Sequence, residues 1–173
     1  TVPLLREIYQ QVEPIRSWKT LGPFPLDAPP NVSTDQPIDF DAKIELAGDK
    51  EIGWRTLRVR DQRGQVNLGR VYSQDDKLAA FGYAEITSKT DHVAKFAVGS
   101  DDTLTVWVNG KQVYDFTDSR AFDYEQSTFE APLVQGVNRI LILCGNNGGP
   151  WQYAVAVSPV ADYAFLKGPE AAA

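Results

Sequence analysis

The chain has 173 residues and a mass of 19.2 kDa, the size of one domain with a substantial hydrophobic core. Hydrophobic residues make up 43% and charged residues 23%, and this ordinary globular composition excludes a disordered, collagen-like or coiled-coil chain. The net charge of -6 argues against nucleic acid as a partner, and the apolar runs are too short to span a membrane. The sequence contains no methionine, and we expect a segment of a larger protein whose neighbouring domains are its partners.

The first part of the chain lacks a strand pattern. Apolar residues at helical spacing predict a short helix or a linker fragment within residues 1–17. From Trp18 to Pro37, prolines at positions 23, 25, 29, 30 and 37 disfavour ladder hydrogen bonds, which predicts an irregular strap around the domain. Trp18 and Trp54 flank this strap and are interpreted as its packing anchors.

After Trp54 the apolar residues alternate with polar ones, as in β-strands. The predicted strands cover residues 56–60, 65–68, 77–87, 92–98, 104–108, 112–116, 128–134, 138–143 and 152–158. Asn109-Gly110 predicts a tight hairpin, and Trp107, on the opposite face from its apolar neighbours, is expected beneath the strap. One open sheet of about nine strands would expose a hydrophobic face, so we predict an antiparallel β-sandwich of jelly-roll type over residues 18–160, followed by a linker at 161–173.

The inventory of reactive residues disfavours an enzyme. The single cysteine, Cys144, excludes a disulfide within the chain and a cysteine-based zinc or haem site, and its apolar strand predicts a buried thiol. No phosphate-binding glycine loop occurs, so no nucleotide is expected. The only histidine, His92, falls at the opposite end from the acidic loops, which disfavours a Ser-His-Asp arrangement.

Chain reversals predict which loops lie together. Because antiparallel strands reverse direction at each turn, alternate loops share one end of a sandwich. Counting from His92, these are loops 99–103, 117–127 and 145–150. They carry carboxylates, amides, a guanidinium and aromatic rings, namely Asp101, Asp102, Arg120, Tyr124, Asn146, Asn147 and Trp151.

These side chains suit a sugar, because aromatic rings stack on its C-H faces and polar groups bond its hydroxyls. We expect Trp151 or Tyr124 to stack, and the aspartates, Arg120 and Asn147 to bond hydroxyls. Asp101 and Asp102, with amide oxygens of Asn146 or Asn147, are also candidate ligands for Ca²⁺. Other interpretations remain open: the aspartates cap a turn, Arg120 neutralises nearby acids, and Trp151 packs over the core rim.

The motifs at residues 99–102, 106–111, 136–142 and 148–153, together with Arg120, resemble the galactose-binding-like β-sandwiches of bacterial carbohydrate-binding modules. The opening at residues 18–25 is similar to the start of such domains in multidomain proteins of planctomycete-type bacteria. The Ser100-Asp101-Asp102 step also resembles PA14-type lectin domains, in which paired aspartates hold Ca²⁺. This second resemblance implies a calcium role for both aspartates, although Thr103-Leu104 follows them here in place of a glycine-rich turn.

The leading hypothesis is a non-catalytic carbohydrate-binding module that targets a larger, extracytoplasmic protein to a polysaccharide or other glycan. The alternative is a structural or docking module without a sugar ligand. Internal contacts of Trp151 and Arg120 would favour the alternative, and an open groove lined by them would favour sugar binding.

Overall fold

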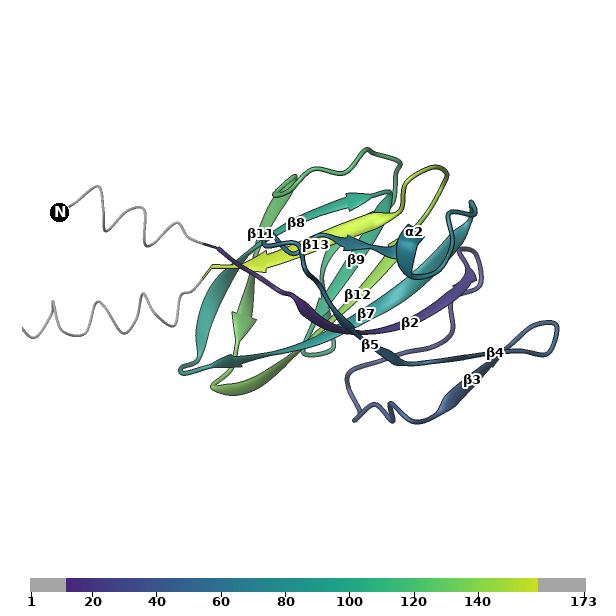
Figure 1. Cartoon of the computed structure of the whole chain (residues 1–173). Helices are drawn as coiled ribbons and strands as arrows, with labels where there is room; N and C mark the ends of the chain where they lie inside the picture. The colour runs from purple at the N-terminus through teal and green to yellow at the C-terminus, as the bar shows by residue number, and fades with distance from the viewer. Residues whose placement is uncertain (1–11, 159–173) are drawn as a thin grey trace, which may run out of the picture.

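The computed structural model describes residues 12–158, which form two facing antiparallel β-sheets (Figure 1). Sheet A has the order β1 (Glu13–Pro14), β13 (Gln152–Val157), β8 (His92–Asp101) and β11 (Ser127–Leu133), and β6 (Val66–Asn67) also pairs with β13. Sheet B has the order β10 (Lys111–Phe116), β9 (Thr103–Val108), β12 (Gly136–Gly145), β7 (Leu78–Ser88), β2 (Ser17–Pro25) and β5 (Arg55–Arg58). A separate hairpin pairs β3 (Lys43–Leu46) with β4 (Lys50–Gly53), and α2 (Leu68–Val71) is one helical turn. The predicted antiparallel β-sandwich is confirmed.

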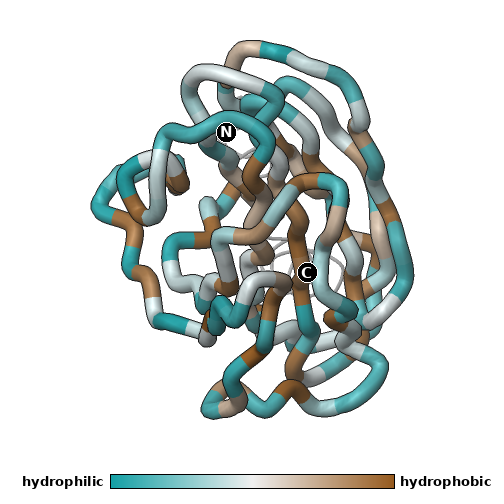
Figure 2. Tube along the Cα trace, turned by 90° about the vertical axis from the view of Figure 1, so that its right-hand side faces the viewer, coloured by the Kyte–Doolittle hydropathy of each residue, from teal (hydrophilic) through white to brown (hydrophobic). Residues whose placement is uncertain are grey.

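The main core lies between the two sheets. Alternate residues of β8, including Phe96 and Val98, face alternate residues of β12, including Ile140 and Ile142, and all four are fully buried. Cys144 lies in the same core as a free thiol, as predicted. Hydrophobic and hydrophilic positions accordingly alternate along much of the chain (Figure 2).

A second hydrophobic layer covers the outer face of sheet B. Leu21, Phe81 and Leu141 on this face pack against partly buried residues of the segment 26–54. The Phe40 and Trp54 rings meet edge to face with their centroids 5.4 Å apart, but Phe40 lies after the predicted strap, so the anchoring role of Trp54 stays a prediction. Trp107 belongs to the same cluster, which confirms its predicted place beneath the strap.

The strap prediction is wrong for residues 18–25, because they belong to strand β2 inside sheet B. Pro23 falls where the register with β7 shifts between Leu21 and Phe24, and β5 pairs only with residues 17–20. The prolines therefore interrupt few ladder hydrogen bonds. Trp18 is consequently a core residue, with its ring 5.2 Å from that of Tyr153, and not an anchor of the strap.

Smaller differences concern short elements. The predicted strand 65–68 is reduced to β6, because the Asn67 side chain accepts the Arg70 N–H and caps α2. The β3–β4 hairpin was not predicted. β1 pairs with the end of β13, and β2 begins at Ser17, so residues of the expected N-terminal segment take part in the sandwich. Residues 1–11 of that segment and the linker at 161–173 lie outside the described residues.

Within residues 12–158, no helical segment has the length and hydropathy of a membrane span.

Candidate functional site

The structure brings the three predicted loops together at one end of the sandwich. Gly145 at the end of β12 pairs with Thr103 at the start of β9, and Gln152 at the start of β13 pairs with Asp101 at the end of β8. The loop from β10 to β11 reaches the same end, since Arg120 in it contacts Ser100. The three loops therefore share one end of the sandwich, as the chain reversals predict.

Asp102 joins the three loops. Its side chain is 4% exposed, and its two carboxylate oxygens accept the backbone N–H groups of Arg120 at 3.1 Å and of Asn147 at 2.7 Å. Its own backbone N–H donates to the Gly145 carbonyl at 3.0 Å. A buried carboxylate needs such donors, and here they come from loops far apart in the sequence.

Asp101 lies beside Asp102 and is also buried, and the peptide bond between them is cis. Burial, and next the negative charge of Asp102, raise the pKa of the Asp101 carboxyl to about 6. A cation at this position would relieve the repulsion between the two carboxylates. Among residues 12–158 no group of three or more His, Cys, Asp and Glu side chains could hold a metal ion, so calcium here would need amide or carbonyl oxygens as further ligands.

Arg120 fastens the loop between β10 and β11 to the end of β8. Its guanidinium donates to the Ser100 hydroxyl at 2.8 Å and to the Ser100 carbonyl at 3.2 Å, and it lies 3.9 Å from the centroid of the Phe116 ring. Gln126 adds a bond from the same loop, because its side-chain oxygen accepts the Ser100 N–H at 2.9 Å. Arg120 therefore has internal partners and is only partly exposed.

The neighbouring asparagines differ in exposure. Asn146 is fully buried, and its amide donates to the carbonyls of Asp75 and Gly149. Asn147 is half-buried, and its amide donates to the Ser119 hydroxyl at 2.8 Å. Only Asn147 of the pair keeps part of its side chain at the surface beside Asp102.

Trp151 does not line an open surface. It is 1% exposed, its indole N–H donates to the Cys144 carbonyl at 3.1 Å, and its ring packs 6.1 Å from that of Tyr72. The prediction that Trp151 stacks on a sugar is therefore wrong, because the hydrophobic ring closes this end of the core.

Tyr124 faces a different surface, the outer face of sheet A. It lines a cavity of about 200 Å³ whose floor includes Ala97 and Ala154. Its hydroxyl donates to the Asp61 carboxylate at 2.8 Å, and the Arg63 guanidinium lies 3.9 Å from the centroid of its ring. Neither partner could be predicted from the sequence pattern, because both lie about sixty positions earlier in a different loop.

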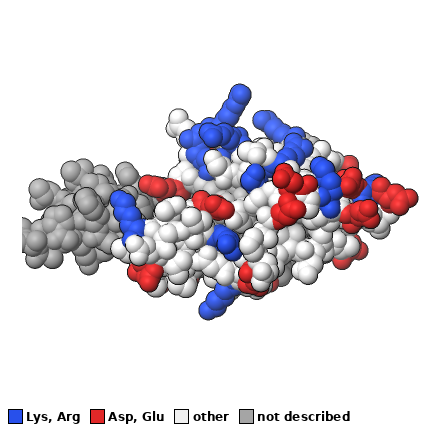
Figure 3. Space-filling model, turned by 90° about the horizontal axis from the view of Figure 1, so that it is seen from below, with Lys and Arg blue, Asp and Glu red and all other residues white. Residues whose placement is uncertain are grey.

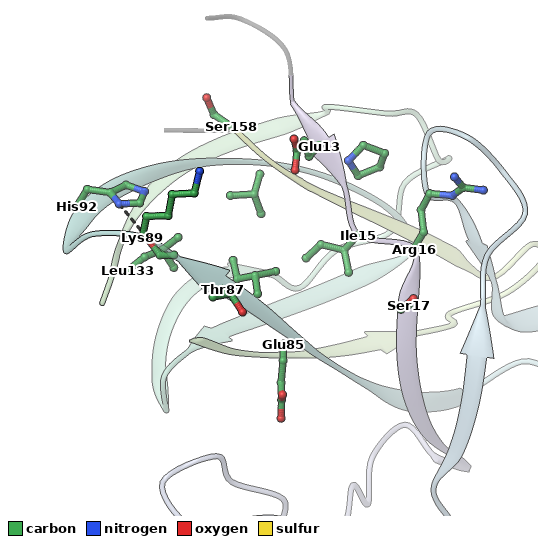
Figure 4. A pocket seen from close by; sticks show the side chains of 14 residues that line it. Glu13, Ile15, Arg16, Ser17, Glu85, Thr87, Lys89, His92, Leu133 and Ser158 are labelled. Atoms are coloured by element: carbon green, nitrogen blue, oxygen red, sulfur yellow. Dashed lines mark hydrogen bonds between the residues drawn. The ribbon is translucent and has the colours of Figure 1, made fainter. Parts of the chain in front are cut away.

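The opposite end of the sandwich holds a larger cavity, of about 390 Å³, that sequence analysis also missed. Its walls combine Ile15, Thr87, Lys89, His92 and Leu133, while Glu85 and Arg16 point away from its centre (Figure 4). The His92 ring lies beside its own turn, with its Nδ1 3.0 Å from the Thr90 carbonyl oxygen. His92 is thus remote from the aspartates, as predicted.

No family model matches the sequence, and no curated protein gives a significant match. A β-glucosidase from Kluyveromyces marxianus, solved with glucose, has a similar fold at TM-score 0.51 and 11% identity over 82% of this chain and 16% of that chain. The PA14 domain of the MpAFP antifreeze protein has a TM-score of 0.41 and 14% sequence identity over 47% of this chain and 43% of that chain. A family 35 carbohydrate-binding module from Clostridium thermocellum has a TM-score of 0.35 and 17% sequence identity over 46% of this chain and 69% of that chain. At these identities the β-glucosidase match supports the β-sandwich fold alone.

Proposed function

We propose that this β-sandwich is a non-catalytic carbohydrate-binding module of a larger, extracytoplasmic protein, and that it binds glycan at the end formed by Asp101, Asp102 and Asn147. The observation that carries the proposal is a pair of adjacent, buried carboxylates at a meeting point of three loops. Loops on a rigid scaffold are the usual place for binding residues. A part of the β-glucosidase that was solved with glucose shares this fold, and a sugar ligand for this chain agrees with that likeness.

Calcium is part of the proposal. The two aspartate carboxylates and the side-chain oxygen of Asn147 are hard oxygen donors, which Ca²⁺ prefers. The charge of the ion would offset the burial and the repulsion from Asp102 that together raise the pKa of Asp101 to about 6. A calcium ion bound there would in turn offer its remaining coordination positions to sugar hydroxyls. Arg120 then serves to hold the loop in place and does not contact the ligand.

The experiment measures thermal unfolding with calcium, with a chelator and then with a panel of neutral polysaccharides. A ligand at about 100 times its Kd stabilises the native state by about 2.7 kcal/mol. For a chain of this size, about 1 kcal/mol corresponds to roughly 2–4 °C. We therefore expect calcium to raise the Tm by roughly 5–10 °C, and a binding polysaccharide to raise it further only when calcium is present.

Asp101→Asn replaces one proposed carboxylate ligand with an uncharged amide, and Asp118→Asn is the matched control because Asp118 is an exposed carboxylate on the nearby loop. The calcium shift should disappear in Asp101→Asn and persist in Asp118→Asn. Equal shifts in both variants, or no polysaccharide binding under any condition, would contradict the proposal.

A docking module without a sugar ligand is the second candidate. The observation in its favour is that Trp151 and Arg120 are engaged in internal contacts. Under this function, neither calcium nor any polysaccharide shifts the Tm, whereas a neighbouring domain of the same polypeptide does when added as a separate chain.

A further inference from the structure

Arginines concentrate on one part of this acidic protein. Residues 55–70 contain five arginines and a single acid, Asp61, although the whole chain has a net charge of -6. All five arginines are exposed. On the face shown in Figure 3, basic side chains are prominent along the upper edge, and acidic side chains are most numerous at the right-hand end, where basic ones lie among them.

Two of these arginines line a groove of about 300 Å³ between β5, β6 and α2. Arg60 and Arg70 line this groove together with Asp61, Gln65 and Asn67. Its apolar part is formed by Leu57, Val59, Val66 and Val71. The volume lies at the lower end of that of small-molecule sites, about 300–1,000 Å³, and fits a single ring better than a flat protein surface.

Other arginines fix the walls of the groove. Arg16 donates from Nε to the Val59 carbonyl and from Nη2 to the Arg60 carbonyl, each at 3.2 Å. Arg55 donates to the Val71 carbonyl at 3.3 Å and stacks 5.2 Å from the Tyr72 ring centroid. The backbone on both sides of the groove is thereby held in place.

The guanidinium groups of Arg60 and Arg70 are available. Within residues 12–158, neither the Arg60 nor the Arg70 side chain bonds to a carboxylate or another acceptor. The Asp61 carboxylate is engaged on one oxygen, which accepts the Gln65 N–H and the Tyr124 hydroxyl at 2.8 Å each. Two unpaired like charges beside one cavity favour an anion, and the planar fork of arginine matches carboxylate and sulfate oxygens.

We infer that this groove binds an acidic sugar residue of a polysaccharide, with Arg60 and Arg70 on its anionic group and the Asn67 NH2 group on a hydroxyl, while the Gln65 amide is held by its bond to the Gln152 side chain at 2.6 Å. The site is separate from the Asp101–Asp102 end and requires no calcium. Carboxylate sugars and sulfated sugars share the chemistry that two guanidinium groups recognise.

The test measures binding of the whole chain to polygalacturonate, dextran sulfate, neutral dextran and polyglutamate, with a chelator present throughout. We expect binding to polygalacturonate, dextran sulfate or both, and none to dextran. The double variant Arg60→Gln/Arg70→Gln should lose roughly tenfold or more in affinity, because each removes a charge-assisted bond. Arg60→Lys/Arg70→Lys keeps the charge without the fork and should lose less.

The charge-matched control is Lys50→Gln/Arg58→Gln. Leu57 pairs with the core residue Trp18, so the neighbouring Arg58 points to the opposite face of β5, away from the groove. Lys50 lies on β4 in the separate hairpin.

The control variant should keep the affinity of the unmodified chain, and Asp101→Asn should keep it too, which separates this site from the proposed calcium end. If Arg60→Gln/Arg70→Gln and the control Lys50→Gln/Arg58→Gln lost affinity equally, binding would depend on the overall charge of the protein and not on the groove. That result would overturn the inference. Binding to polyglutamate alone would overturn it in favour of an acidic protein, and so would binding to none of the four polymers.

Discussion

Asp101 is a carboxylic acid held where its charged form is disfavoured. Burial and the neighbouring Asp102 charge raise its pKa from 3.8 to about 6, while the Phe122 N–H partly offsets them. A raised pKa means that the folded state binds the proton more tightly than the unfolded state. The resulting stabilisation is complete below the unfolded value of 3.8 and is lost as the pH rises through about 6.

Asp101→Asn should therefore flatten the pH dependence of stability. Between pH 3.8 and about 6, the contribution of Asp101 in the unmodified protein falls as the pH rises, and the amide removes this contribution. Urea unfolding at several pH values across this window, without calcium, measures the effect. Asp118→Asn is the control and should follow the unmodified protein, while parallel profiles for Asp101→Asn and the unmodified protein would contradict the assignment.

At the scale of elements, the loop between β10 and β11 lies directly on β8. Gly99 allows this approach, because a Cβ at that position would overlap the Asp123 carbonyl oxygen. Next to Gly99, Ser100 receives the bonds from Arg120 and Gln126 that fasten the loop. One small residue thus permits the packing that brings Arg120 to Asp102.

Gly99→Ala should lift this loop from the sheet. Because the overlap is with backbone, the loop must move, and we expect a loss of about 1–3 kcal/mol in the free energy of unfolding. Limited proteolysis within residues 117–126 and urea unfolding measure the two effects. Gly148→Ala is the control, because a Cβ there meets its nearest neighbour at an ordinary 3.5 Å. Unchanged proteolysis in Gly99→Ala would refute the proposed role of the close approach.

At the scale of the whole molecule, the two sheets are joined by side chains that cross the core. Tyr153 of β13 meets the Trp18 ring of β2 edge to face at 5.2 Å. Its hydroxyl lies against Gly82 of β7 and is buried without a hydrogen-bond partner among the described residues. A buried hydroxyl without a partner lowers the free energy of unfolding, because it has lost its hydrogen bonds to water. A bare aromatic ring at the same place has no such penalty.

Tyr153→Phe should therefore stabilise the sandwich, by about 1 kcal/mol, since it removes the unpaired hydroxyl and keeps the ring. Tyr72→Phe is the opposite case, because the Tyr72 hydroxyl is 2.9 Å from the Thr20 hydroxyl, and its loss should destabilise. Urea unfolding of the two variants compares them. A marked loss of stability in Tyr153→Phe would mean that the hydroxyl has a favourable role.

Much of the fold could be predicted from the sequence. Period-two alternation located the strands from Leu78 onward, and Asn109-Gly110 located the β9–β10 turn, where both residues have positive φ. The chain reversals then placed Asp102 near Asn147. The alternation is a local property of the sequence, so the strands can be predicted from it without knowledge of the tertiary structure.

The sequence by itself determined the class of fold, its main strands and the end at which Asp101, Asp102 and Asn147 meet. Only the tertiary structure decided that the proline-containing β2 lies inside a sheet, that Trp151 closes the core, and that Tyr124 contacts Asp61. The physical reason is that alternation shows which side chains share a face of a strand but not which sheet or loop covers that face. The groove beside Arg60 and Arg70 depends on the same information, since β5, β6 and α2 form it from two different sheets.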